Sequence, residues 1–275
     1  MISNTLQIGP LTFPFQLLLV FAAVGVALFV ANFLGRRAGV DADTPLFRVL
    51  LLALLAARLG FVIQYREIYL AMPLDMLDIR DGGWQPVAGV AAAWVGALVL
   101  GWRRPTVRFP VVSALVAATL VWGVGTAALA WQPGQTTALP SISLTSVEGQ
   151  PVALSAFASA PVVVNLWATW CPPCQREMPV MARAQADHPG IHFVFLNQGE
   201  SHSKVQAYLA AHQLGLRNVL LDTQGQAGVH FGQKALPATL FFDAQGRLVD
   251  TRIGELSHAT LSQRLQALAL PQLNH

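Results

Sequence analysis

Two patterns of hydrophobicity divide the chain near residue 132. In the first half, long apolar runs alternate with short polar stretches, and each run is close to the ~20 residues that cross a bilayer core as a helix. In the second half, apolar runs of strand length alternate with helical stretches, which is typical of an α/β domain. The pattern therefore predicts an all-α transmembrane bundle of four spans followed by an α/β domain. The four spans are expected at 12–34, 46–63, 86–102 and 109–131.

A short linker is expected between the two halves. The segment QPGQTTALP contains two Pro, a Gly and small polar residues, as linkers do. We expect a membrane domain over 1–132, a linker over 133–140 and a globular domain over 141–275. Its predicted elements are a hairpin within 141–157, strands at 161–167, 191–197, 217–221, 238–243 and 247–253, and helices at 173–187 (interrupted by Pro179), 202–213 and 257–269.

The first apolar run does not resemble a cleavable signal peptide. Its N-terminal flank has no Lys or Arg, the run is long, and Arg36 and Arg37 follow it instead of preceding it. In an alternative interpretation, the shorter runs at 46–63 and 86–102 are buried helices of a soluble fold. That interpretation would leave the first half with little polar surface, because 54% of the whole chain is hydrophobic and only 11% is charged.

The arginines of the first half predict its topology. They concentrate beside two of the polar stretches, between the first and second runs and between the third and fourth. The positive-inside rule places both stretches in the cytoplasm, so the N-terminus, the 64–85 segment and everything after Trp131 would lie outside. The basic balance does not indicate nucleic-acid binding, since no basic stripe with interleaved aromatics is present. These arginines are Arg36, Arg37, Arg48, Arg103, Arg104 and Arg108.

Arg58 is the one charge well inside an apolar run. An intramembrane Arg is by default a hypothesis of a functional site. The alternative is that its long side chain extends to the outer interface near Tyr65.

The segment around Arg58 also resembles a known membrane family. AARLGFVIQYREIYLAMPLDMLDIRDGGW (56–84) is similar to the second-span region of prolipoprotein diacylglyceryl transferases, which implies a shared membrane scaffold. Where that family continues with Ser-Phe-His-Gly-Gly, this chain has residues 85–89, QPVAG, so the family's His is missing. The positions that fit are Arg58, Leu59, Gly60, Pro73, Gly82 and Gly83.

The chain has two cysteines, in the sequence Cys171-Pro172-Pro173-Cys174. This spacing next to a βαβ pattern is typical of a thioredoxin-like redox motif. A strand that ends at the motif would place Cys171 at the N-terminus of the next helix, where the dipole and free N–H groups stabilise a thiolate. Cys174, one turn further, would be shielded and able to resolve a mixed disulfide.

Two other roles for the cysteine pair are less well supported. Zinc needs about four ligands, and His188 and His192 do not have the spacing to complete a site. A purely structural disulfide over so small a loop would constrain the unfolded chain little. We therefore expect no metal and no cofactor.

The segment NLWATWCPPCQREMP (165–179) resembles the active-site segment of the TlpA-like and ResA-like branch of the thioredoxin superfamily. The resemblance covers about 140–270. It implies Cys171 as nucleophile and Cys174 as resolving cysteine, with Trp170, Pro172 and Pro173 beside them at the substrate. It also implies a bacterial inner-membrane protein with a periplasmic redox domain.

The family further has a cis-Pro loop that faces the disulfide. Ala235-Leu236-Pro237-Ala238-Thr239 matches it, and a cis bond there would expose the Leu236 backbone to a substrate peptide. An ordinary trans Pro at a strand start is the alternative.

One departure concerns proton transfer. Asn165 stands where thioredoxin has a buried Asp, and Asn does not titrate. Glu200 and Glu148 are candidate proton relays, with solvated loop acids as the alternative for both.

The sequence favours a membrane-anchored thiol-disulfide oxidoreductase, with reduction of protein disulfides as the implied direction. The motif does not fix that direction, so an oxidant or isomerase stays open. Since neither cysteine lies in the membrane half, a separate donor of the DsbD or CcdA type is implied. Implied targets include apocytochrome c during cytochrome c biogenesis, copper-site cysteines and oxidised envelope proteins. The alternatives are a membrane module that binds lipid or protein through Arg58 and the 64–85 arm, and a lipoprotein-modifying transferase.

Overall fold

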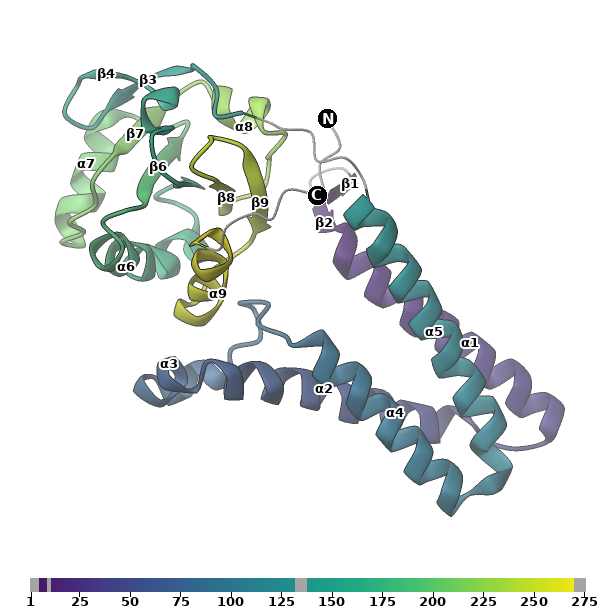
Figure 1. Cartoon of the computed structure of the whole chain (residues 1–275). Helices are drawn as coiled ribbons and strands as arrows, with labels where there is room; N and C mark the ends of the chain where they lie inside the picture. The colour runs from purple at the N-terminus through teal and green to yellow at the C-terminus, as the bar shows by residue number, and fades with distance from the viewer. Residues whose placement is uncertain (1–4, 9–10, 132–137, 270–275) are drawn as a thin grey trace. The chain divides into compact units, whose positions relative to one another are not determined.

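The computed structural model describes residues 5–8, 11–131 and 138–269. The chain divides into a helical unit, Phe13–Pro133, and a second unit that contains the C-terminal half. A two-stranded sheet of β1 (Thr5–Ile8) and β2 (Leu11–Pro14) precedes the first helix, which the hydrophobic pattern did not indicate. The four helices and the α/β domain seen in Figure 1 confirm the predicted fold class.

Four helices of the first unit are long and apolar enough to cross a membrane. Helix α1 packs along α5, and α2 packs along α4 (Figure 1). Many of their large apolar side chains, such as Phe29 and Phe47, are exposed, as a lipid-facing surface requires. The helices are α1 (Phe15–Ala38), α2 (Asp43–Gln64), α4 (Pro86–Arg103) and α5 (Pro105–Trp131).

Small residues form the contacts between these helices. Ala and Gly recur at every fourth position on the buried face of α4, from Gly89 to Gly101. A Cβ added at Gly89 would lie 3.1 Å from the Ala53 carbonyl oxygen, and one at Gly60 would lie 2.8 Å from the Ala88 Cβ. Close backbone approach of this kind drives helix association in membranes, where apolar burial gives little.

Two features differ from the predicted loops of this unit. Arg108 lies inside α5 and not in a loop, because α5 begins at Pro105, a residue that suits the first helical turn. The 64–85 arm contains helix α3 (Arg66–Ala71) and a 3₁₀ turn η1 (Pro73–Leu77).

The second unit is built on a seven-stranded mixed sheet in the order β4-β3-β7-β6-β5-β8-β9. Strands β5, β6 and β7 are parallel, β8 runs antiparallel to β5, and β9 runs antiparallel to β8. The predicted hairpin is present, with β3 paired antiparallel to β4. The strands are β3 (Ser143–Ser146), β4 (Pro151–Ala153), β5 (Val162–Trp167), β6 (His192–Gln198), β7 (Val219–Asp222), β8 (Ala238–Phe242) and β9 (Leu248–Ile253).

Each face of the sheet carries its own apolar core. Every residue of β5 is buried, which is why this strand reads as a continuous apolar run. Val163 and Trp167 pack into one core with helix α6, whereas Val162 and Val164 pack into the other. The helical elements are η2 (Leu154–Phe157), α6 (Pro172–Asp187), α7 (His202–Ala211), α8 (Gln226–His230) and α9 (His258–Ala269).

The predicted interruption of the motif helix at Pro179 is wrong, since α6 runs through it. Pro179 is exposed, so its ring meets solvent and not the sheet. Cys174 and Met178 before it, and Met181 after it, are buried in the same core. Packing on both sides therefore keeps one helix axis despite the lost hydrogen bond.

Candidate active site

The Cys-x-x-Cys motif lies where the central strand β5 ends and α6 begins. Cys171 and Cys174 form a disulfide, with their Cα atoms 5.2 Å apart. Cys171 is 3% exposed and Cys174 is fully buried. Only the first cysteine is therefore within reach of a partner, and Trp170 beside it is 62% exposed.

Cys171 occupies the N-cap position of α6. The backbone N–H of Cys174 donates to the Cys171 sulfur at 3.3 Å. Pro172 and Pro173 occupy the first helical positions, where a backbone N–H group would have no acceptor within the helix. The free helix terminus and this hydrogen bond favour the negatively charged form of the sulfur, so the geometry gives Cys171 the character of a thiolate nucleophile.

The loop that leads into the motif is fixed by a buried acid. Glu200 accepts hydrogen bonds from both the backbone N–H and the hydroxyl of Thr169, each at 2.6 Å. It also accepts from the Asn197 amide at 2.8 Å and pairs with Lys204 at 2.7 Å. Gln175 completes the clamp by donating to the Thr169 carbonyl.

These contacts decide between the two interpretations of Glu200. The expectation of a solvated loop acid is wrong, because Glu200 is 6% exposed. Burial by itself raises the pKa of its carboxyl, but the hydrogen bonds from Lys204 and Thr169 outweigh burial and hold that pKa at about 2. A carboxylate that stays ionised is a poor acceptor for a thiol proton, so its geometry fits a positioning role. Glu148 is exposed on the β3–β4 turn and makes none of these contacts.

The Leu236–Pro237 peptide bond is cis. Strand β8 starts one residue later and pairs antiparallel with β5, so that Ala238 faces Leu166. This register brings Pro237 to the end of β5, where the cysteine motif begins. Leu236 is half-buried and packs against the core cluster that contains both cysteines.

Glu177 is the titratable residue of the site that sequence reasoning missed. It is fully buried on α6, three residues after Cys174 and therefore on the same helix face. Its carboxylate accepts from the Asn165 amide at 2.8 Å and from the Leu256 backbone N–H at 3.1 Å. Burial raises the pKa of Glu177 to about 8. The signal in the sequence was an acid among the apolar positions of an amphipathic helix.

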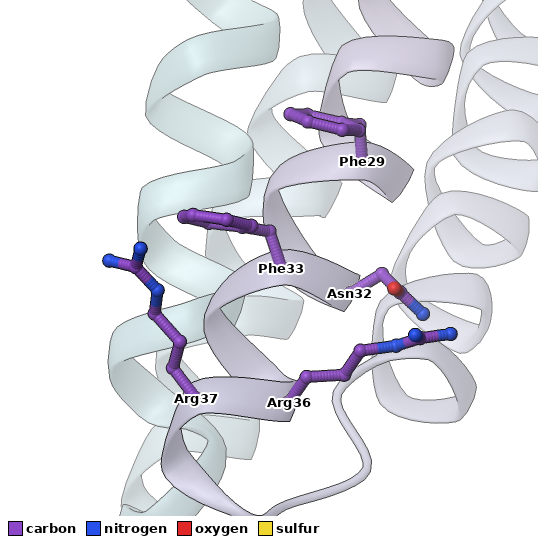
Figure 2. A pocket seen from close by; sticks show the side chains of 5 residues that line it. All are labelled: Phe29, Asn32, Phe33, Arg36 and Arg37. Atoms are coloured by element: carbon purple, nitrogen blue, oxygen red, sulfur yellow. The ribbon is translucent and has the colours of Figure 1, made fainter.

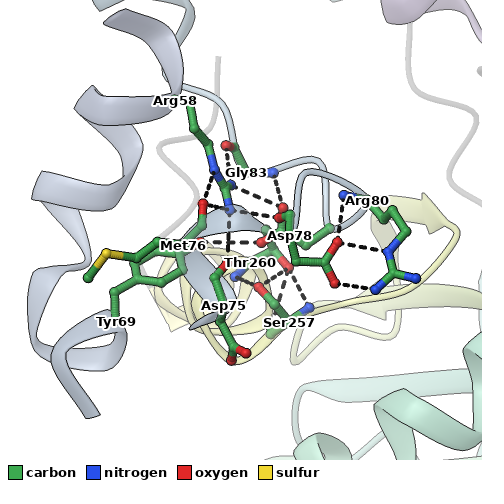
Figure 3. A network of polar contacts seen from close by, with 10 residues as sticks. Arg58, Tyr69, Asp75, Met76, Asp78, Arg80, Gly83, Ser257 and Thr260 are labelled. Carbon is green, nitrogen blue, oxygen red and sulfur yellow. Dashed lines mark hydrogen bonds and ion pairs between the residues drawn. The ribbon is translucent and has the colours of Figure 1, made fainter. Parts of the chain in front are cut away.

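Arg58 is placed in a separate network in the membrane unit, shown in Figure 3. Its guanidinium is buried and donates to the carbonyl oxygens of Asp75, Met76, Asp78 and Gly83, at 2.7 to 3.2 Å. It also forms a buried ion pair with Asp81 at 3.1 Å.

The donors of this guanidinium are used by the chain itself. Each of the three nitrogens donates at least one hydrogen bond to the arm. The geometry therefore fits a side chain that holds the 64–85 arm on α2, and it leaves Arg58 little capacity for a ligand.

Comparisons with known proteins agree with this division of the chain. The model of the Redoxin family matches residues 132–268, and the model of prolipoprotein diacylglyceryl transferase matches residues 4–129. The second match extends well beyond the 56–84 segment that carried the resemblance in the sequence.

Individual relatives match the C-terminal half. The thiol-disulfide oxidoreductase ResA of Bacillus subtilis is 30% identical over 125 residues, which cover 44% of this chain and 69% of the relative. ResA of Geobacillus thermodenitrificans is 29% identical over 132 residues, covering 47% and 75%. Among solved structures, MTB dsbF is 29% identical and covers 50% of this chain and 98% of its own, with a TM-score of 0.45.

Proposed function

The chain belongs, through its C-terminal half, to the ResA-like thiol-disulfide oxidoreductases, and on this premise we propose that it is a membrane-anchored reductase of protein disulfides. The observation that supports this most directly is the disulfide at the N-terminus of α6, with Cys171 at the helix cap and Cys174 buried behind it. We further propose that the protein is bacterial and that its redox domain lies in the periplasm. The arginine distribution of the first half and the family both support this placement.

The proposed reaction moves two electrons from the Cys171–Cys174 dithiol to a substrate disulfide. The Cys171 thiolate attacks one substrate sulfur, forms a mixed disulfide and releases the other substrate sulfur as a thiolate. Cys174 then attacks the Cys171 sulfur, which releases the second substrate thiol and closes the Cys171–Cys174 disulfide. The substrate gains two electrons and two protons, and the enzyme ends oxidised.

Glu177 supports the second step. The Cys174 thiol must lose its proton inside the core before it can attack, and Glu177 lies on the same face of α6 with a pKa that burial raises to about 8. An acid with that pKa can accept and release a proton near neutral pH. Asn165, which replaces the titratable residue of thioredoxin, acts here by donating to the Glu177 carboxylate.

Substrate contact is assigned to the surface around Cys171. Trp170 offers an exposed aromatic face, Pro172 is also exposed, and the Leu236 backbone precedes the cis bond at the same end of β5. An extended peptide could pair with this backbone as an added strand does.

The chain needs an external source of electrons to turn over. Both of its cysteines belong to the redox motif, so the membrane unit has no thiol with which to reduce the disulfide. We assign this task to a membrane thiol donor of the DsbD or CcdA type, and the transmembrane unit to anchoring in the bilayer.

The reduction potential of the full chain in detergent tests the direction. The protein is equilibrated with dithiothreitol or glutathione buffers, and its free thiols are trapped and counted. A value near −270 mV, roughly that of thioredoxin, supports the reductase. A value near about −120 mV would make it an oxidant and overturn the proposal.

A further inference from the structure

The loop between β9 and α9 is joined to the candidate active site at two points. Gly254, whose φ of 93° is positive, donates its backbone N–H to the Pro237 carbonyl oxygen at 2.9 Å. Leu256 donates its backbone N–H to the Glu177 carboxylate at 3.1 Å, and its side chain is buried in the core that contains both cysteines. Glu255 lies between these two residues. The loop therefore bridges the cis-Pro loop and the helix that follows the cysteine motif.

Arg176 holds Glu255 in a bidentate ion pair. The Arg176 Nε lies 3.1 and 3.0 Å from the two carboxylate oxygens, and the Nη2 lies 2.6 Å from one of them. The Glu255 side chain is only 15% exposed, so water and salt screen its charge less than they would on an open surface. Arg176 precedes Glu177 in the chain, and Glu255 precedes Leu256. Each partner of the ion pair is therefore the neighbour of a partner in the buried hydrogen bond.

This fixed geometry distinguishes Arg176 from arginines that simply extend from the surface. Arg36 and Arg37 leave the last turn of α1 in different directions (Figure 2), and within the described part of the chain neither side chain forms an ion pair. The Arg37 guanidinium instead lies 4.2 Å from the centre of the Phe33 ring. A planar fork on both oxygens of one carboxylate fixes the orientation of both groups, so Arg176 fixes the position of the loop at Glu255.

The ionisation of Glu177 depends on groups from four parts of the fold. Burial is the largest cause that raises its pKa to about 8. From β5, the uncharged Asn165 donates its amide to the carboxylate and lowers the pKa, and the hydrogen bond from the loop backbone does the same. Glu255 of the loop raises the pKa, whereas Arg252 of β9 lowers it. Cys174, one helical turn earlier on α6, is the group whose proton the carboxylate would take.

We propose that Arg176 and Glu255 are positioning residues for the resolving step, because they hold Glu177 in a form that can take up a proton. The inference rests on the role of Glu177 proposed above. In that step the Cys174 proton passes to the Glu177 carboxylate, and the freed thiolate attacks the sulfur of Cys171. The S–S bond between Cys171 and the substrate breaks, and its electron pair leaves with the substrate sulfur. Arg176 and Glu255 act on this step through Glu177.

The two residues act on Glu177 in opposite senses. The negative charge of Glu255 disfavours a second ionised carboxylate beside it. Arg176 offsets that charge, and by fixing the loop it also keeps the Leu256 N–H on the Glu177 carboxylate. Removal of the arginine should therefore make Glu177 harder to ionise, whereas removal of the acid should make it easier. An ion pair that served stability alone would give the same change whichever partner was lost.

The experiment follows both steps of disulfide exchange in one stopped-flow trace. The reduced full chain in detergent is mixed with equimolar DTNB, a chromogenic disulfide that releases one coloured thiolate when Cys171 attacks and a second when Cys174 resolves the mixed disulfide. We expect the second phase to become faster as the pH rises through the pKa of Glu177, which is about 8. The midpoint of that rise is measured between about pH 6 and 9. The first phase monitors the amount of active protein, because it needs only Cys171.

Variants that remove one charge should move this midpoint in opposite directions. Arg176→Gln should raise it and Glu255→Gln should lower it, each by about half a pH unit, which is about a threefold change in rate at neutral pH. Glu255→Gln keeps an amide oxygen that can accept from Arg176, so the loop stays in place. The double variant should return close to the wild type. Arg183→Gln is the matched control, since it removes the same charge from the same helix at an exposed pair with Asp187, and its midpoint should not move.

Three results would overturn the inference. Shifts in the same direction would mean that the pair serves stability alone, and unmoved midpoints would mean that it has no influence on Glu177. A shift in Arg183→Gln equal to that in Arg176→Gln would make the overall charge of α6 the cause.

Glu177→Gln separates these results from a failure of the role proposed for Glu177. If that variant kept the wild-type second phase at every pH, Glu177 would not be the proton acceptor, and the inference would fall with that role. The roles of the two cysteines would still stand, because both phases would still be seen. A second phase that loses its pH dependence in Glu177→Gln confirms the premise, and the charge variants then decide the inference by themselves.

Discussion

The Asn165 amide donates a hydrogen bond of 2.8 Å to the Glu177 carboxylate, inside the core and one helical turn from Cys174. Asn165 also donates to the Thr239 hydroxyl at 3.0 Å on the neighbouring strand. One side chain thus links the strand before the cysteine motif, the helix after it and the strand that follows the cis-Pro loop.

Glu177 should make the stability of the oxidised C-terminal half depend on pH. Its pKa is about 8 in the fold against 4.5 for an ordinary glutamate, so folding favours the protonated form. The contribution of Glu177 to stability is therefore fully present below pH 4.5 and is lost as the pH rises through 8, by a few kcal/mol at about 1.4 kcal/mol per pKa unit. Glu177→Gln should flatten this dependence. Pulse proteolysis in urea between pH 5 and 9 measures it, and an unchanged slope in the variant would contradict the assignment.

The two cysteines should give different phenotypes in disulfide exchange. Cys174→Ser leaves the nucleophile but removes the group that resolves the mixed disulfide, so a covalent enzyme–substrate complex should accumulate on a non-reducing gel. Cys171→Ser should form no complex and show no turnover, because Cys174 is fully buried. Complex formation by Cys171→Ser would mean that the roles are reversed.

Glu200 should act on stability more than Lys204 does. Glu200→Gln weakens the ionic hydrogen bonds to Thr169 and Asn197 in a buried position, which costs roughly 1–3 kcal/mol. Lys204→Met removes only an ion pair whose lysine is 55% exposed, and such pairs contribute about 1 kcal/mol or less. Urea unfolding of both variants at pH 7 tests the order, and a larger loss in Lys204→Met would refute it.

Arg58 should be needed for the membrane unit and not for the redox reaction. Arg58→Ala leaves the carbonyl oxygens of the arm without donors, so the 64–85 arm should become sensitive to protease. Arg58→Lys should rescue little, since an ammonium cannot reproduce the planar fork. Disulfide reduction by the detergent-solubilised variant should stay near the wild-type rate. If the variant lost disulfide reduction while the arm stayed resistant to protease, the hypothesis of a membrane binding module would be favoured over that of an enzyme.

Close packing of α2 against α4 predicts a contrast between two glycines. Gly60→Ala would place a Cβ 2.8 Å from the Ala88 Cβ, which has no rotamer to escape, whereas Gly25→Ala meets nothing within 4 Å. We expect Gly60→Ala to destabilise the unit by about 1–3 kcal/mol and Gly25→Ala to be close to neutral. Thermal unfolding in detergent measures both, and equal midpoints would contradict the close approach.

Elements with a periodic or continuous apolar pattern could be predicted from the sequence. The four spans and strand β5 follow from apolar runs whose exposure to water would be unfavourable. Helix α3 and the turn η1 could not, because the 64–85 arm takes its form from contacts with one distant arginine. The interruption at Pro179 was wrong because local propensity gave way to packing on both sides of it.

The same distinction applies to the candidate site. Cys171 and Cys174 were evident from spacing alone. The burial of Glu200 was not, since it depends on Thr169, which is 31 residues away in the chain. Glu177 was overlooked because its partners Asn165 and Leu256 come from two other elements.

Arg58 contacts the arm almost entirely through main-chain carbonyl oxygens, and Asp81 provides the one side-chain acceptor. Main-chain acceptors are present whatever the side chain is. The backbone conformation of the arm can therefore be kept while many of its side chains change. Homologues should thus tolerate broad drift at Met76, yet exchange Arg58 and Asp81 only together. An engineer could rewrite the exposed positions of this arm, provided that its length, these two residues, Tyr69 and Gly83 were kept.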